Sequence, residues 1–299
     1  MSVSVDLQTM VPGFTWDQAV AEADRCLLCH DAPCSKGCPA GTDPATFIRQ
    51  LRLRNVTGAI RTIRQNNVLG GACGVLCPAA RLCERECSAS GLDQPIRIGR
   101  LQRFLIEHAW KIGFNVFDNP RYRKPEPRSG RVAVVGAGPA GLSCASELAQ
   151  NGYAVTLFEQ REEPGGVLRY GVPSFRFDPG FLRRELDDLK PLGVEIRCAT
   201  PLRGPEQLDE LLKEYQAVFM AVGLWQAIPL IEGKRPRSGV FSSIRFLERF
   251  RRDDLEALTR ECRGKTVAVV GGGSVAIDCA QVKSALLSHR KIHVRPRSV

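Results

Sequence analysis

Eight of the twelve cysteines lie between Cys26 and Cys87, in two groups with short spacings. The first group has two, four and three residues between its members, and Pro39 follows its last one; the members are Cys26, Cys29, Cys34 and Cys38. The second group has three, five and three residues between its members, which are Cys73, Cys77, Cys83 and Cys87. Thiolates brought together this densely are ligands for iron–sulfur clusters or for zinc.

The order of the first group favours iron–sulfur clusters. A run that ends in Cys-Pro is typical of ferredoxins, in which the fourth cysteine serves a different cluster from the first three, so two clusters are predicted. Structural zinc is the alternative, but zinc sites usually carry two Cys-x2-Cys pairs and only one is present. Disulfides are less favoured because we expect a reducing compartment. The other four cysteines are predicted to be inert thiols; they are Cys144, Cys198, Cys262 and Cys279.

A glycine-rich turn after residue 135 predicts a dinucleotide site. The predicted strand Val132–Val135 leads into a G-x-G-x-x-G turn and a helix, and the next strand, Ala154–Phe158, ends on Glu159. The glycines permit the turn and close approach of a pyrophosphate, the helix offers free N–H groups, and the acidic residue accepts hydrogen bonds from a ribose. The turn consists of Gly136, Ala137, Gly138, Pro139, Ala140 and Gly141.

A second unit of this kind begins near residue 267. The predicted strand Val267–Val270 leads into three glycines and a helix that reaches about Leu287, and Ile292–Val294 can form the following strand. The unit can hold a second dinucleotide by the same means. The alternative is a close-packed turn that binds no nucleotide, because no downstream acidic residue is available to support the assignment.

Two regions of different pattern must position these residues. The first part predicts helices: Thr15 and Gln18 form a capping box, Asp43 precedes a proline at a helix start, and a break is expected at Thr57–Gly58. From Arg131 onward short strands alternate with helices, which indicates a doubly wound α/β sheet. We therefore predict an α+β multidomain chain: a helical domain with two clusters over residues 1–120, the first part of a Rossmann-like domain over 121–225, and an incomplete second nucleotide domain over 226–299.

The composition of the 299-residue chain excludes little by itself. The net charge of +10 comes from 42 basic and 32 acidic residues, but no compact basic block with aromatic residues occurs, so no nucleic acid partner is expected. The segment from Met1 to Met10 lacks the pattern of a signal peptide, and no stretch is long enough to cross a bilayer. We expect a cytoplasmic protein with no membrane contact.

Several stretches together resemble the NAD(P)H-oxidising iron–sulfur flavoproteins, a family that includes the glutamate synthase small subunit and the N-terminal part of dihydropyrimidine dehydrogenase. The resemblance is carried by Cys26–Arg49, Leu82–Phe104, the glycine turn, and Glu162–Arg176. It implies FAD, NAD(P)H, two [4Fe–4S] clusters, and a hetero-oligomeric partner that holds FMN and reduces uracil or thymine. Family members continue further at the C-terminus, so the chain is expected to be truncated.

The resemblance also implies cluster ligands. One cluster would be held by Cys26, Cys29, Cys34 and Cys87. The other would be held by Cys38, Cys77, Cys83 and Gln102, which leaves Cys73 over. No catalytic acid or base is expected on this chain, because the cofactors supply the chemistry.

The resemblance also implies further residues at the two nucleotide sites. It adds Gly165, Gly166, Val167, Arg176 and Leu202 to the FAD site. It assigns the segment Gly272, Gly273, Ser274 and Val275 to the NAD(P)H phosphates, although Ser274 stands where the family commonly has an acidic residue. Two alternatives stay open: a glutamate-synthase-type small subunit, and a cluster-binding relay without nicotinamide activity.

Overall fold

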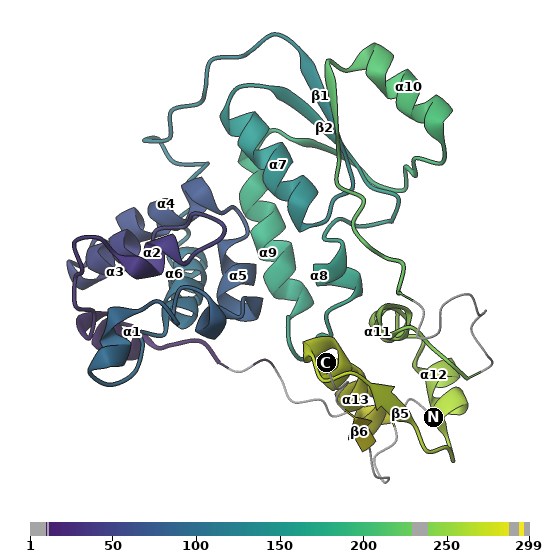
Figure 1. The fold of residues 1–299 in the computed structure, drawn as a ribbon. Coiled ribbons are helices and arrows are strands. Elements are labelled where there is room, and N and C mark those ends of the chain that lie inside the picture. The colour runs from purple at the N-terminus through teal and green to yellow at the C-terminus, as the bar shows by residue number, and fades with distance from the viewer. Residues whose placement is uncertain (1–9, 11, 229–238, 287–292, 296–299) are drawn as a thin grey trace.

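A computed structural model describes residues 10, 12–228, 239–286 and 293–295. In Figure 1 a group of helices near the N-terminus lies beside a unit that combines a sheet with helices. None of the described helices is long and apolar enough to span a bilayer.

The N-terminal group consists of short helices joined by cysteine-bearing loops. Its elements are α1 (Trp16–Asp24), α2 (Pro33–Lys36), α3 (Pro44–Arg52), α4 (Val56–Asn66), α5 (Gly70–Leu76), α6 (Ile98–Lys111) and the 3-10 turns η1 (Ala79–Arg81) and η2 (Ser88–Gly91). The predicted capping box is confirmed, because Gln18 N donates to Thr15 Oγ1 at 3.3 Å and Thr15 N donates to Gln18 Oε1 at 3.0 Å. Asp43 caps α3 by accepting from Thr46 N at 3.1 Å.

The predicted break between the third and fourth helices is wrong in its position. The helices are interrupted at 53–55 rather than at Thr57–Gly58, and α4 already begins at Val56. Asn55 explains the early start, because its side chain accepts a hydrogen bond from Gly58 N at 3.1 Å and so caps the helix. Beyond this cap, Ile60 and Ile63 are buried in the same core as Phe47 of α3.

The α/β unit is built on a parallel sheet. Its elements are β1 (Arg131–Val135), α7 (Pro139–Gln150), β2 (Ala154–Phe158), α8 (Val167–Tyr170), α9 (Pro179–Leu189), η3 (Lys190–Leu192), β3 (Glu195–Arg197), α10 (Pro205–Glu214) and β4 (Ala217–Met220). Among the described residues the strand order is β3-β2-β1-β4, with every pair parallel. Because β1 lies between β2 and β4, the turns after β1 and β2 open at one edge of the sheet, where ligands of such sheets bind.

A second, smaller group of elements follows. It consists of α11 (Ser243–Arg251), α12 (Leu255–Cys262), β5 (Ala268–Val270), α13 (Ser274–Leu286) and β6 (His293–Arg295). The strands β5 and β6 pair in parallel, with Ala268 opposite His293. The predicted strand at 292–294 is thus displaced by one residue, and Ile292 itself lies outside the described residues. Phe246, Leu258 and Val282 are buried in a core that joins α11, α12 and α13.

The junction between the helical group and the α/β unit is a buried polar contact. Helix α5 packs against α9. Glu185 of α9 is fully buried and accepts hydrogen bonds from Gly71 N at 2.8 Å and Ala72 N at 2.7 Å, at the start of α5. Arg64 of α4 donates to Glu185 at 3.0 Å and to Asp188 at 2.5 Å. The helix that carries Cys73 is therefore fixed to the α/β unit.

Candidate functional site

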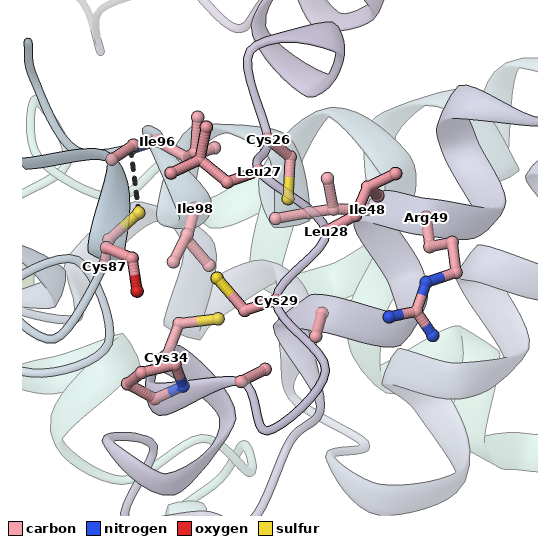
Figure 2. A pocket seen from close by; sticks show the side chains of 15 residues that line it. Cys26, Leu27, Leu28, Cys29, Cys34, Ile48, Arg49, Cys87, Ile96 and Ile98 are labelled. Carbon is pink, nitrogen blue, oxygen red and sulfur yellow. Dashed lines mark hydrogen bonds between the residues drawn. The ribbon is translucent and has the colours of Figure 1, made fainter. Parts of the chain in front are cut away.

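Four cysteines from separate segments surround one pocket. Cys26 and Cys29 lie in the loop after α1, Cys34 lies in α2, and Cys87 directly precedes η2. All four line the same pocket, whose remaining walls are mainly apolar (Figure 2). The structure thus brings together the set that the resemblance implied for one cluster, including Cys87, which follows Cys34 by more than fifty residues.

The loop around this pocket is fixed by arginine side chains. Arg52 Nη1 donates to the carbonyl oxygen of Cys26 at 3.1 Å. Arg25 Nη2 donates to the carbonyl oxygen of Gln94 at 2.7 Å, which ties the segment before Cys26 to the segment after Cys87. These bonds position the backbone of the cysteines without occupying their sulfur atoms.

The thiols of this group influence one another. Burial, with the nearby Cys87 and Cys26, raises the pKa of the Cys34 thiol to about 11. Such a thiol binds metal only after it loses its proton, so metal binding at this pocket is coupled to proton release. A set of mutually close thiols in an apolar pocket fits the donor chemistry of an iron–sulfur cluster.

The spacing of the donors matters for the choice between a cluster and zinc. Four thiolates on one zinc ion at 2.3 Å would lie about 3.8 Å from one another. Across the described ranges no group of three or more His, Cys, Asp or Glu side chains is close enough together to hold a single metal ion. The described residues that line the pocket instead offer four thiols, a donor set that iron–sulfur clusters use.

The second cysteine group gathers around α5 and the loop after it. Burial, followed by Glu84, Cys38 and Cys77, raises the pKa of the Cys83 thiol to about 12, so the charges of Cys38 and Cys77 act on this thiol. Burial and then Cys73 and Cys38 raise the pKa of the Cys77 thiol. The structure therefore places Cys73, which the resemblance left over, beside the expected ligands.

The possible donor atoms of Cys73 and Gln102 differ in their hydrogen bonds. Asn67 Nδ2 donates a hydrogen bond to Cys73 Sγ at 3.1 Å, so this sulfur already has a polar partner. Gln102 lies on α6, which packs against α5, and its Nε2 donates to the carbonyl oxygen of Gly70 at 2.6 Å. Within the described part of the chain no hydrogen bond reaches Gln102 Oε1, so this oxygen remains available as a donor.

The first glycine turn has the geometry that a pyrophosphate needs. Gly136 has a φ of +105°, and a Cβ at Gly141 would lie 1.8 Å from the carbonyl oxygen of Gly136. A Cβ at Gly138 would meet only Gly166 Cα, at 3.8 Å, so Gly138 is not required for packing. The absence of a side chain at Gly138 instead leaves the start of α7 open to a phosphate.

Glu159 and the second glycine pair lie at the same edge of the sheet. Glu159 is 5% exposed, and its carboxylate accepts from Ala137 N at 2.8 Å and Arg161 N at 2.9 Å. Gly165 N donates to the carbonyl oxygen of Ala137 at 2.8 Å, which places Gly165, Gly166 and the following Val167 against the turn. A carboxylate has further lone pairs, so Glu159 can still accept hydrogen bonds from a ribose.

Two further residues expected at the FAD site lie in different surroundings. Arg176 Nη1 forms an ion pair with Asp278 of α13 at 3.0 Å. Leu202 lies in the loop before α10, and the backbone bond from Thr200 N to the carbonyl oxygen of Glu159, at 2.8 Å, holds the start of that loop beside Glu159. Leu202 is therefore near the turn, whereas Arg176 joins the first nucleotide unit to the second.

The second glycine turn is open. Gly271 has a φ of +125°, and a Cβ at Gly273 would meet nothing within 4 Å. Ser274 begins α13, and Val275 is 48% exposed. The segment from Gly272 to Val275 is thus accessible to a ligand at the N-terminus of a thirteen-residue helix.

The sequence reasoning missed the buried polar residues that hold these parts together, notably Glu185, Asp188 and Glu84. Glu84 Oε1 accepts from Gly99 N at 3.0 Å, at the start of α6. Arg64 gave a partial indication of a buried ion pair. It follows the core residue Ile60 by four positions, so this charged side chain lies on the same, buried helix face. Its partner Glu185 is 121 residues away, so no local pattern identified it.

Comparison with protein families agrees with this division of the chain. Residues 4–114 match the family described as dihydropyrimidine dehydrogenase domain II, 4Fe-4S cluster, and residues 130–298 match the family described as pyridine nucleotide-disulphide oxidoreductase. Because the second match covers more than half of the chain, the chain belongs to the pyridine nucleotide-disulphide oxidoreductase family. The predictions of an iron–sulfur region followed by an α/β nucleotide-binding region, and of an oxidoreductase, are confirmed.

Comparison with individual proteins shows which members of these families the chain is similar to. The chain is 42% identical over 282 residues to the NAD-dependent dihydropyrimidine dehydrogenase subunit PreT of Salmonella typhimurium, and the match covers 94% of this chain and 65% of that protein. PreT of Escherichia coli is 40% identical with the same coverage. The glutamate synthase [NADPH] small chain of Escherichia coli is 31% identical, with 90% of this chain and 57% of the relative covered. The chain thus spans less than two thirds of the length of these relatives.

Proposed function

We propose that the chain takes a hydride from NAD(P)H onto FAD and passes electrons singly, through two [4Fe–4S] clusters, to a partner subunit. The partner would hold FMN and reduce a pyrimidine such as uracil or thymine. The observation that carries this proposal is the direct packing of α5 on α9 of the α/β unit, because the expected ligand Cys77 directly follows α5. The second cluster would therefore lie on the side of the helical domain that faces the flavin-binding unit.

The residues of the chain bind and orient rather than react. FAD and the clusters would supply the hydride and one-electron chemistry. Gly136 to Gly141 and the N-terminus of α7 would hold the FAD pyrophosphate, with Glu159 on the ribose. Gly272 to Val275 at the N-terminus of α13 would hold the phosphates of NAD(P)H.

The cluster ligands are proposed as the resemblance set them out. The first cluster would take Cys26, Cys29, Cys34 and Cys87, a set supported by their shared pocket. The second would take Cys38, Cys77, Cys83 and Gln102, supported by the mutual influence of the thiols and by the open amide oxygen of Gln102.

The visible spectrum of the purified protein tests the proposal. Flavin absorption that bleaches on addition of NADH or NADPH, together with broad cluster absorption, is the expected result. Cluster absorption without flavin would favour the alternative of a relay that binds no nicotinamide. The coenzyme that bleaches the flavin at the lower concentration would identify the nicotinamide substrate.

A second candidate is a glutamate-synthase-type small subunit, favoured by the 31% identity to that chain. The two candidates have similar cofactors and differ in the protein that receives the electrons. Mixing the reduced protein with an FMN-containing dihydropyrimidine dehydrogenase subunit and uracil should yield dihydrouracil. Formation of glutamate with a glutamate synthase large subunit, and no dihydrouracil, would select the second candidate.

A further inference from the structure

Two adjacent leucines cover the four-cysteine pocket at the protein surface. Leu27 and Leu28 lie between Cys26 and Cys29, line the pocket, and are 47% and 45% exposed (Figure 2). Leu28 has a φ of +56°, a left-handed conformation that a large side chain rarely adopts. Such strain is maintained only where the surrounding structure enforces it, and it is often found at functional positions.

Exposed positive charge lies at this pocket and beside it. Arg49 lines the pocket, whereas Arg97, between the lining residues Ile96 and Ile98, lines the neighbouring pocket together with Glu22 and Arg25. Both arginines are exposed, and neither guanidinium has an ion pair or hydrogen bond within the described residues. Neighbouring basic residues are neutralised instead, since Arg25, Arg52 and Lys36 pair with Glu22, Asp24 and Asp31.

This surface lies on the side of the helical domain that faces away from the α/β unit. Helix α5, which is followed directly by Cys77, contacts α9, whereas α1, α2 and α3 lie on the side away from the α/β unit (Figure 1). An electron that leaves the flavin-binding unit would therefore reach the second cluster before the first. The first cluster would then be the point from which it leaves the chain.

We propose that Leu27, Leu28, Arg49 and Arg97 form the docking face at which an acidic protein partner receives an electron from the first cluster. This inference rests on the proposed function. Protein interfaces combine an apolar centre with a polar rim, and charges on the rim steer association. The face has both parts: exposed leucines that line the four-cysteine pocket, and exposed arginines at this pocket and the neighbouring one.

The proposed reaction is the transfer of one electron from the first cluster to the acceptor. A reduced cluster held by Cys26, Cys29, Cys34 and Cys87 would supply one electron, and the acceptor's redox centre would be reduced by that electron. No proton or bond is involved. Any acidic one-electron acceptor can therefore serve as a probe, and an acidic rubredoxin is suitable because its single iron accepts one electron.

The test uses the chain reduced with dithionite, so it does not depend on nicotinamide activity. Arg49→Glu and Arg97→Glu are compared with Arg183→Glu, which alters an exposed arginine on α9 with no side-chain partner among the described residues. We measure the Kd for oxidised rubredoxin and the rate of its reduction in a stopped-flow mixer. Basic cytochrome c is the second acceptor, and Arg49→Lys is the variant that retains the charge.

Each reversal should weaken rubredoxin binding and slow its reduction about tenfold at low salt, because charge complementarity acts mainly on association. Cytochrome c should respond in the opposite direction, and Arg49→Lys and Arg183→Glu should behave as wild type. In 1 M salt the differences should vanish, because the screening length falls to about 3 Å.

The outcomes separate this inference from the proposed function. Wild-type protein without iron would overturn both. With iron present, unchanged binding in the two reversals would overturn the docking face alone. A parallel change with both acceptors would also overturn it, because an altered cluster potential, unlike docking, does not depend on the acceptor's charge.

Discussion

At the scale of single residues, the second cluster has five candidate donors for four positions: Cys38, Cys73, Cys77, Cys83 and Gln102. Asn67 already donates to Cys73 Sγ, whereas Gln102 is oriented by its bond to Gly70 and keeps its Oε1 free. We therefore expect Cys73→Ser to retain about eight irons per chain, as two [4Fe–4S] clusters require, and Cys77→Ser to lose about four. Iron and sulfide analysis measures both. Loss of about four irons in Cys73→Ser would return the ligand set to the eight cysteines.

Replacing the amide oxygen with a thiol tests whether Gln102 is a cluster ligand. Gln102→Cys should keep about eight irons but lower the potential of one cluster, because a thiolate adds negative charge that stabilises the oxidised state. Redox titration followed by electron paramagnetic resonance reports the two clusters separately. Unchanged potentials in Gln102→Cys would show that this side chain is not a ligand.

Glu159 has two roles that can be separated. It holds the glycine turn through Ala137 N, and it is proposed to bind the FAD ribose. Glu159→Ala should weaken FAD binding by ~1–3 kcal/mol, because the ribose hydroxyls lose their acceptor. Glu159→Gln should lose less, since its amide oxygen can still accept from Ala137 N. Flavin content after gel filtration gives the effect, and equal flavin retention in wild type and Glu159→Ala would contradict the ribose role.

At the scale of elements, the strand–turn–helix at β1 and α7 distinguishes two uses of glycine. Gly141 is required by packing, because a Cβ there would collide with the carbonyl oxygen of Gly136. Gly138 has room for a Cβ, so its use is to leave space for a ligand. We therefore propose that Gly141 serves the fold and Gly138 serves the nucleotide.

This distinction predicts different outcomes for the same substitution. Gly141→Ala should destabilise the folded protein, whereas Gly138→Ala should fold with a normal Tm and lose FAD. Gly273→Ala is the control for steric effects, because a Cβ there meets nothing within 4 Å. Circular dichroism melts and flavin absorption measure the two properties. Full flavin occupancy in Gly138→Ala would contradict the assignment of this turn to a phosphate.

At the scale of the whole molecule, the junction between the helical domain and the α/β unit depends on a buried network in which Arg64 pairs with Glu185 and Asp188. The side chains of Arg64 and Glu185 are 3% and 0% exposed, and Trp110 Nε1 joins the network by donating to Asp188 at 2.8 Å. Arg64 also donates to the carbonyl oxygen of Val68, just before α5. Removing Glu185 would leave Arg64 with Asp188 as its remaining ion-pair partner and would leave the N–H groups of Gly71 and Ala72 without their acceptor.

We expect Glu185→Ala to lower the free energy of unfolding by about 3–5 kcal/mol, the range for a buried pair that loses one member. Asp187→Ala on the same helix is the matched control: it breaks the exposed pair with Lys190 and should cost about 1 kcal/mol or less. Urea denaturation measures both. Equal costs for the two variants would show that the buried network does not hold the domains together.

The features that the sequence determined are those set by neighbours within a few residues. The strand Ala154–Phe158 was predicted to its exact ends, and the Thr15 cap and the glycine turn formed as expected. In these cases turn chemistry, capping and apolar periodicity act locally, and composition alone gave the density of thiols. The break before α4 was misplaced because the capping role of Asn55 was not recognised.

Only the tertiary structure decided which distant residues meet. Spacing could not group Cys87 with Cys26, bring Cys38 near Cys77, or pair Arg64 with Glu185 across 121 residues. It also could not show that Arg176, expected at the flavin, pairs with Asp278 of the following unit. Each of these contacts depends on how helices pack, and packing is fixed by the complementary burial of whole faces rather than by any local pattern.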